Sequence, residues 1–237
     1  MKVPCTLLLS FLVTAAVRAE PLVVLVASSV DMPMADIRDG KLHGGVHLDL
    51  GKALAQKLQR ELVVQVLPRK RLDGALASGR ADILCTYQPD WLEGKHAWTQ
   101  PFFPQSDLLL TSLSVPRPAS AADVRGQPVG TVLGFAYPDL DRTLGAGFVR
   151  SDVSSSVANL QKFRLGRIQH IVVDKAIHDY QVRLGVKLNA HPPLVVMHQL
   201  TRCAVSTRSK IPLQEIDAAI TQLLREGAIH KILSNYQ

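Results

Sequence analysis

Cysteine is scarce in this 237-residue sequence, and long runs of one charge are missing. The basic residues, which give a formal net charge of +7, are scattered and are not interleaved with aromatic side chains. A nucleic-acid interface usually shows a basic patch or stripe, so the pattern favours a solvated surface over nucleic-acid binding. Motifs of catalysis and cofactor binding (G-x-S-x-G, H-E-x-x-H, the P-loop, G-x-G-x-x-G) are also missing. These absences favour a binding function without catalytic residues or a cofactor.

Metal binding is also not expected, because the eight histidines are dispersed and no C-x-x-C pair occurs. His43 and His47 are four residues apart, but the intervening Gly44-Gly45 argues against one continuous helix face. We therefore expect both histidines to lie on the surface.

Long apolar runs are limited to the N-terminus. Lys2 precedes an apolar run from Leu7 to Val17, which ends in Val17-Arg18-Ala19. The run is too short to span a bilayer and is typical of a secretory signal peptide, here cleaved after Ala19. Cys5 precedes the run, so no lipid anchor is expected. No later segment is long and apolar enough for membrane insertion, which predicts a soluble exported protein.

Two cysteines remain after such processing, Cys85 and Cys203. In an oxidising compartment, an isolated pair is a disulfide candidate. The alternative is two small buried thiols. The sequence leaves both possibilities open.

Apolar runs alternate with helical periodicity along the first half of the chain. We expect strands at 22–27, 62–67 and 81–86, and helices at 46–58 and 71–78. This alternation is typical of an α/β sandwich with a parallel sheet. Ligands bind such sheets outside the carboxyl ends of the strands. The candidate ligand-binding residues are therefore Thr86, which ends the third run, and Tyr87 and Trp91, which follow it.

A second α/β unit is expected after a strand at 103–113 and a proline-rich connector. Its expected elements are strands at 129–133, 168–173 and 194–197 and a helix at 154–165, with a return segment at 202–206 and final helices at 212–224 and 228–234. The order helix, Gly-Arg, apolar strand occurs at both 76–85 and 163–174. This echo favours two similar lobes.

The block PRKRLDGALASGRADILCTYQPDWLEGKHAWTQPFF at 68–103 resembles the bacterial extracellular solute-binding proteins of the polar amino-acid type, family 3. Further pieces follow the family's order at 40–58, 122–134, 160–174 and 212–233. The resemblance implies an α/β, two-lobed type II periplasmic-binding-protein fold, in which each lobe is a doubly wound sheet and a two-stranded hinge joins them. Lobe 1 would hold residues 20–108 and 204–237, and lobe 2 residues 109–203.

The resemblance also implies a function. The protein would be a periplasmic monomer whose lobes close on a small polar ligand, for delivery to an inner-membrane ABC permease. Two alternatives stay open: a soluble ligand-sensing partner of a membrane receptor, and an exported cyclohexadienyl dehydratase-like enzyme. In the enzyme, Arg69 would act with Asp174 or Asp31.

The family's usual clamp on the ligand's α-carboxylate is missing. An arginine soon after the P-D/E turn normally forms a two-pronged hydrogen bond with this group, but Trp91 stands there. The second lobe's Gly-Thr-Thr reads Gly134-Phe135-Ala136. The acidic partner of the ligand's ammonium is retained as Asp174. Its alternative role is to cap the helix that begins at Lys175.

Other residues could replace this clamp. Trp91, Tyr87, Phe135 and Tyr137 would line the cleft with aromatic rings, which suit a flat ring or an organic cation. For Trp91 the alternative is ordinary packing under the loop. Arg69 follows Pro68 at a strand end that faces the cleft in this fold and could supply a positive charge. The alternative is that Arg69 lies in solvent at the start of a helix.

The first strand-to-helix loop completes the candidate site. Ser28 and Asp31 lie in this loop, where members of the family also contact their ligand. The alternative is that both residues only form the turn.

Overall fold

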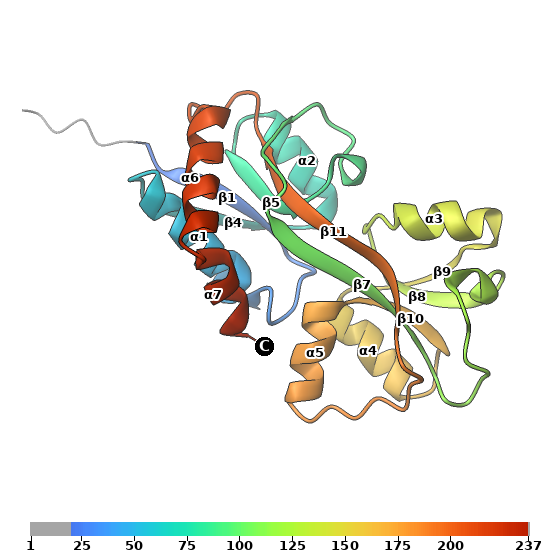
Figure 1. Cartoon of the computed structure of the whole chain (residues 1–237). Helices are drawn as coiled ribbons and strands as arrows, with labels where there is room; N and C mark the ends of the chain where they lie inside the picture. The colour runs from blue at the N-terminus through green and yellow to red at the C-terminus, as the bar shows by residue number, and fades with distance from the viewer. Residues whose placement is uncertain (1–19, 237) are drawn as a thin grey trace, which may run out of the picture.

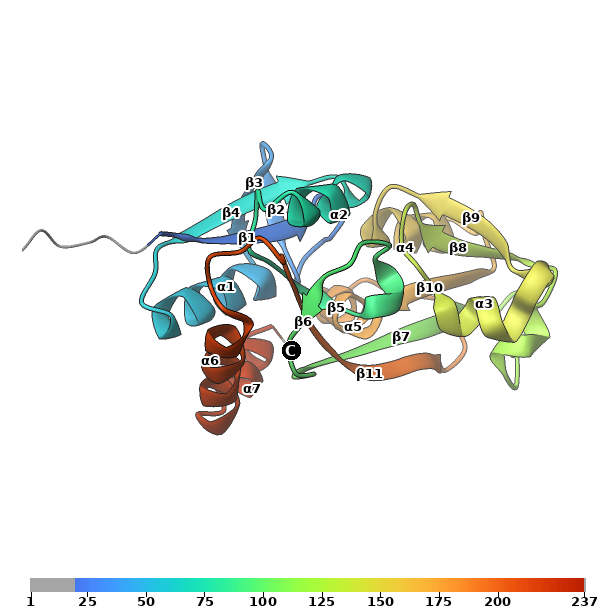
Figure 2. The ribbon, with the colours of Figure 1, turned by 90° about the horizontal axis from the view of Figure 1, so that it is seen from above.

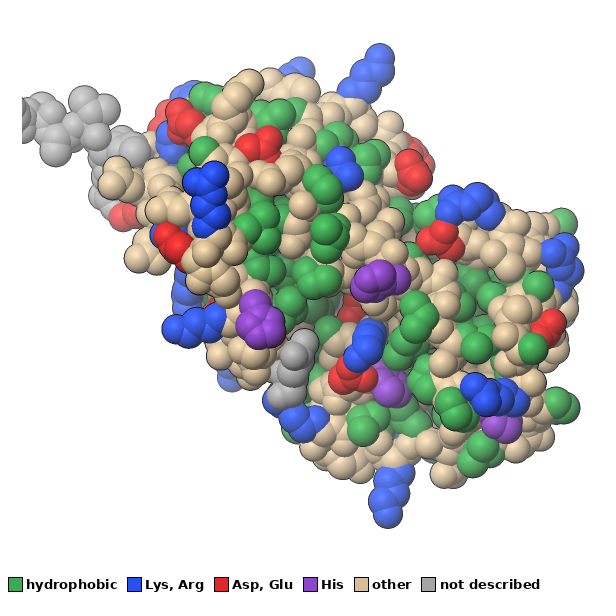
Figure 3. Space-filling model, viewed as in Figure 1, with side chains coloured by type: hydrophobic (Ala, Val, Ile, Leu, Met, Phe, Trp, Pro, Cys, Tyr) green, Lys and Arg blue, Asp and Glu red, His purple; other side chains and the backbone are tan. Residues whose placement is uncertain are grey.

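The computed structural model describes residues 20–236. The expected signal peptide at residues 1–19 lies outside the described residues. Within them, no helix combines the length and the apolar character that a bilayer crossing requires. The described chain forms two lobes joined by two long strands, β7 and β11 (Figure 1). Lys and Arg side chains are spread over both lobes on the face that Figure 3 shows.

The first lobe is built on parallel strands. β1 (Leu22–Ala27) pairs with β4 (Leu62–Leu67) on one side and β5 (Ile83–Tyr87) on the other. Leu22 and Val24 pack with α1 (Val46–Lys57), α6 (Leu213–Arg225) and α7 (Ala228–Ser234), while Leu25 and Ala27 pack with α2 (Arg69–Ala77). Alternate strand residues point to opposite faces, so helices cover both faces of this sheet (Figure 2).

The second lobe repeats this plan. β8 (Pro128–Val132) lies between β9 (Val149–Val153) and β10 (His170–Asp174), parallel to both. The helices are α3 (Pro138–Leu144), α4 (Ser156–Arg164) and α5 (Lys175–Arg183). The remaining short elements are the β2–β3 hairpin (Asp36–Arg38, Lys41–Gly44), β6 (Ala97–Trp98) and the 3-10 turns η1 (Pro89–Trp91), η2 (Ala121–Val124) and η3 (Gly145–Gly147).

The two connecting strands pair with each other. β7 (Phe103–Thr111) and β11 (Leu194–Val205) are antiparallel, and the sheet order is β4-β1-β5-β11-β7-β10-β8-β9. The expected strand 194–197 and return segment 202–206 are one continuous strand. The lobe boundaries expected after residues 108 and 203 therefore fall inside β7 and β11.

The internal echo extends to backbone hydrogen bonds. After α2, the N–H groups of Gly79 and Arg80 donate to Leu76 and Ala75; after α4, Gly166 and Arg167 donate to Phe163 and Lys162. Both are Schellman ends, which need a left-handed residue, and the two glycines have φ of 76° and 68°. Each helix is thereby turned into the next strand, β5 or β10.

Cys85 and Cys203 form a disulfide, which decides between the two alternatives of the sequence. They face each other across β5 and β11 with Cα atoms 3.8 Å apart, and they close a loop with a sequence separation of 118.

Replacing both cysteines by alanine is expected to lower the free energy of unfolding by about 3 kcal/mol, because the bond restricts the unfolded chain. Urea denaturation of both proteins measures the loss, and dithiothreitol should destabilise only the parent. Equal midpoints would contradict this expectation.

Candidate functional site

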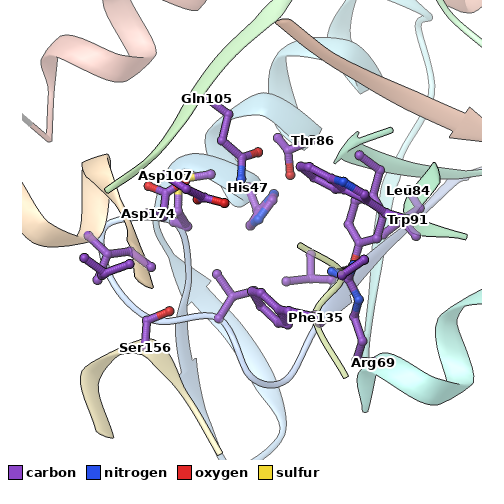
Figure 4. A pocket seen from close by; sticks show the side chains of 18 of the residues that line it. His47, Arg69, Leu84, Thr86, Trp91, Gln105, Asp107, Phe135, Ser156 and Asp174 are labelled. Atoms are coloured by element: carbon purple, nitrogen blue, oxygen red, sulfur yellow. Dashed lines mark hydrogen bonds between the residues drawn. The ribbon is translucent and has the colours of Figure 1, made fainter. Parts of the chain in front are cut away.

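A cavity of about 810 Å³, its open mouth included, lies between the lobes (Figure 4). Its walls include the carboxyl ends of β1, β5 and β10. Ligands of α/β folds bind at such strand ends, which makes this cavity the candidate small-molecule site. Seven of the nine residues predicted to bind ligand line the cavity: Arg69, Thr86, Tyr87, Trp91, Phe135, Tyr137 and Asp174.

Arg69 reaches from the first lobe to the second. Its guanidinium carbon lies 4.5 Å from the ring centre of Tyr87 and 4.7 Å from that of Phe135, and Nη1 donates to the Tyr87 hydroxyl at 2.8 Å. Gly134 of the second lobe packs closely against Arg69, because a Cβ atom at this position would lie 3.3 Å from Arg69 Cγ. Arg69 makes no ion pair within residues 20–236, so its remaining N–H donors are available to an anionic ligand group.

Thr86 occupies a bulge at the end of β5. Cys203 pairs with Cys85 and Arg202 with Tyr87, so Thr86 is the extra residue between them. Its φ is 63°, a left-handed conformation that is strained for a β-branched residue. Bulges re-aim side chains next to functional sites, and Thr86 is a buried member of the cavity wall.

Thr86→Gly is expected to be more stable than Thr86→Ala by about 1 kcal/mol, because glycine adopts a left-handed φ without steric cost. Both variants lack the hydroxyl, so the comparison isolates the backbone strain. Chemical denaturation measures the difference, and a less stable glycine variant would argue against strain at this position.

Asp174 caps a helix, which is one of the two roles that the sequence left open, and it also lies at the cavity. It ends β10, and its Oδ1 accepts the N–H of Ala176, capping α5 at 2.8 Å. Its side chain also lines the cavity. Burial raises the pKa of Asp174 to about 6, although the N–H groups of Ala176 and Ile177 favour the charged form.

Asp107 is a cavity residue that was not predicted from the sequence. It lies opposite Asp174 in the β7–β10 pair and also lines the cavity. Within the described chain, its carboxylate has no hydrogen-bonding or basic partner. Burial, and then the charges of Asp174 and Asp139, raise the pKa of Asp107 to about 8. The sequence signal that could have identified Asp107 is its place directly before the apolar run Leu108-Leu109-Leu110, inside a predicted strand.

His47 was wrongly expected on the surface. His43 lies in β3 and is exposed, whereas His47 lies in α1, is buried and lines the cavity. Burial lowers the pKa of His47 to about 4, so the ring is neutral at pH 7. Gln105 and Ser156 also line the cavity and were not predicted. Among residues 20–236, no cluster of three or more His, Cys, Asp or Glu side chains could hold a metal ion.

Ser28 and Asp31, the other two predicted residues, are not among the residues that line the cavity. Ser28 is exposed, and its backbone N–H donates to Leu67 just after β1. Asp31 instead joins the lobes, because its Oδ2 accepts the N–H of Val157 in the first turn of α4 at 2.8 Å. Together with the stacking of Arg69 on Phe135, this bond holds the lobes in contact across the cavity.

Two aromatic residues of the wall also serve the fold. The Tyr137 hydroxyl accepts the N–H of Val132 at 3.0 Å, and burial raises the pKa of Tyr137. Trp91 contacts Tyr87 edge-on with ring centres 6.1 Å apart and packs against the core of the first lobe. The Trp91 Nε1 atom is buried without a hydrogen-bond partner. Trp91 thus packs against the core of the first lobe and also keeps an indole N–H group without an acceptor.

Comparisons with known proteins agree with this architecture. No family model matches the sequence, and no curated protein matches it. Solved structures match over most of the chain. An ancestral amino-acid-binding protein, a precursor of cyclohexadienyl dehydratase, is 18% identical (TM-score 0.73; 91% of this chain and 94% of that chain covered).

Two further structures have other roles. The GluR0 ligand-binding core in complex with L-glutamate is 18% identical (TM-score 0.75; 94% and 99% covered). The substrate-binding protein of an amino acid ABC transporter is 16% identical (TM-score 0.70; 91% and 98% covered). These matches confirm the α/β, two-lobed type II periplasmic-binding-protein fold. At such identities they establish the fold alone.

Proposed function

We propose that this chain is a periplasmic solute-binding protein that captures a small amino-acid-like molecule between its lobes. Delivery to an inner-membrane ABC permease would follow, with the protein acting as a monomer. The observation that carries the proposal is an arginine and an aspartate that face one cavity without an ion-pair partner. Neither Arg69 nor Asp174 makes an ion pair within the described residues, and the two lie on opposite sides of the cavity (Figure 4).

These charges suit a molecule with a carboxylate and a cationic group. The guanidinium of Arg69 offers several N–H donors to the carboxylate, held between two aromatic rings that restrict its motion. Asp174 accepts the cationic group. The carboxylate is thus bound from α2 of the first lobe, whereas the family's usual arginine position is occupied by Trp91. Aromatic walls add contacts for an apolar or flat ligand body.

Closure of the lobes is linked to binding in this proposal. Arg69 lines the cavity and stacks on Phe135 of the second lobe. A ligand bound to Arg69 therefore favours the closed arrangement of the lobes. The bond from Val157 to Asp31 forms at the same interface and adds to the stability of the closed state.

A thermal-shift screen tests the proposal. The protein lacking residues 1–19 is heated with amino acids, amines, polyamines, aromatic acids and short peptides. Ligand at a hundredfold excess over Kd should add about 2.7 kcal/mol of stability. We expect the hits to carry both a carboxylate and a cationic group. Hits confined to uncharged compounds, or none at all, would contradict the proposal.

A dehydratase-like activity is the second candidate, favoured by Asp107. Its raised pKa, about 8, means that this carboxyl holds a proton at neutral pH in the same cavity as Arg69. A positioned acid and a carboxylate-binding arginine are what a cyclohexadienyl dehydratase-like enzyme needs. Incubation with prephenate and arogenate tests this candidate. Turnover that disappears in Asp107→Asn supports an enzyme, and absence of turnover argues for a binder.

A further inference from the structure

We infer that Asp107 makes the cavity selective for ligands with a net positive charge, such as a dibasic amino acid, by joining Asp174 in binding their cationic groups. This inference rests on the proposed function. It adds a specificity-determining residue and narrows the ligand class.

The geometry of the two carboxylates is the first support. Asp107 in β7 and Asp174 in β10 are directly opposite in an antiparallel pair, where side chains point to the same face of the sheet. Both line the cavity, and Figure 4 shows them next to each other. Like charges directly opposite each other are unfavourable, so the two carboxyl groups ionise together only when a cation lies beside them.

The charges around the pair are the second support. The residues that line the cavity include one cation, Arg69, and two carboxyl groups, while His47 is neutral because of its lowered pKa. The other titratable groups that face Asp107 are Asp139 of α3, which pairs with Arg142, and Tyr137. Asp139 and Tyr137 are acids, His47 is neutral, and Arg69 lies on the opposite side of the cavity. No cation of these elements therefore neutralises Asp107.

Ligand charge then decides the protonation of Asp107. A zwitterion satisfies Arg69 and Asp174 and leaves Asp107 without a cation. A lone buried carboxylate is costly, so Asp107 keeps its proton in that complex. A ligand with one more positive group allows both carboxylates to ionise. Binding of such a ligand near pH 7 therefore releases the proton of Asp107, and its affinity rises with pH until about 8.

Calorimetric titration with matched ligands tests the inference. L-arginine is compared with the uncharged isostere L-citrulline, and L-lysine with L-norleucine. The wild-type protein is expected to bind each basic ligand at least about tenfold more tightly than its isostere. Asp107→Asn should reduce this preference to about threefold or less and leave citrulline affinity nearly unchanged. Asp139→Asn, which changes a carboxylate outside the cavity lining, should retain the preference.

Proton release gives a readout that needs no variant. Titrations at pH 7 in two buffers of different ionisation enthalpy should show release of about half to one proton per arginine and none per citrulline. The inference alone is overturned if citrulline and norleucine bind as tightly as arginine and lysine, if no proton is released, or if folded Asp107→Asn keeps the preference. If none of the four ligands nor any compound of the screen binds, the proposed function fails with it.

Discussion

Asp174→Asn is expected to weaken binding of the ligand found in the screen about a thousandfold and leave the fold intact. Removing one partner of a buried charge pair costs about 3–5 kcal/mol, because the other charge stays desolvated. Asparagine is as good a helix N-cap as aspartate, so the bond to Ala176 and the start of α5 should persist. Calorimetry gives the affinity, and the melting temperature without ligand reports the fold.

Asp179→Asn is the matched control for this variant. Asp179 lies on the same helix, α5, and pairs with Lys175 on the surface. Surface pairs contribute about 0–1 kcal/mol, so binding should be nearly unchanged. If Asp174→Asn bound ligand within about threefold of wild type, Asp174 would be only a helix cap, and the assignment of the cationic end would be wrong.

Arg69→Ala is expected to lower affinity for a carboxylate-bearing ligand at least about hundredfold. The change removes a charged hydrogen-bond donor and the guanidinium that stacks on both Tyr87 and Phe135. Arg69→Lys should rescue little of this loss, because an ammonium cannot stack as a planar fork. Lys70→Ala, at the neighbouring exposed position of α2, is the control and should bind normally.

A ligand analogue separates the two functions of Arg69. Converting the ligand's carboxylate to an amide should weaken binding to the wild type but hardly change binding to Arg69→Ala. If the amide lost equal affinity in both proteins, the carboxylate would be bound elsewhere, and Arg69 would only join the lobes.

Much of the fold could be predicted from local signals. β1 and β4 begin and end where the apolar runs predicted, and α7 has its predicted bounds. β9 and α3 were missed because VRSDV at a sheet edge and PDLDRTL carry little apolar periodicity. The single strand β11 was predicted as two pieces, since its middle, His198 to Thr201, is mostly polar.

The cavity wall was predictable where strand ends mark it and where the family resemblance points to neighbouring loops, as for Trp91 and Phe135. Thr86, Tyr87 and Asp174 lie at the ends of β5 and β10, the positions from which α/β sheets bind ligands. Asp107 lies in the middle of a strand, and its pairing with Asp174 joins segments that are far apart in the chain. His47 was assigned to the surface although it lies in the predicted helix 46–58. Its spacing of three residues from the buried Leu50 places it on the buried face of α1, and this signal was not used.

Titration of the protein lacking residues 1–19 with the screen's best ligand, alongside Arg69→Ala and Asp174→Asn, tests the central claim most directly. We expect one ligand per protein, with Kd below about 100 μM in the wild type and affinity lost in both variants. The central claim is contradicted if the ligand carries no charge or if both folded variants bind it as tightly as the wild type.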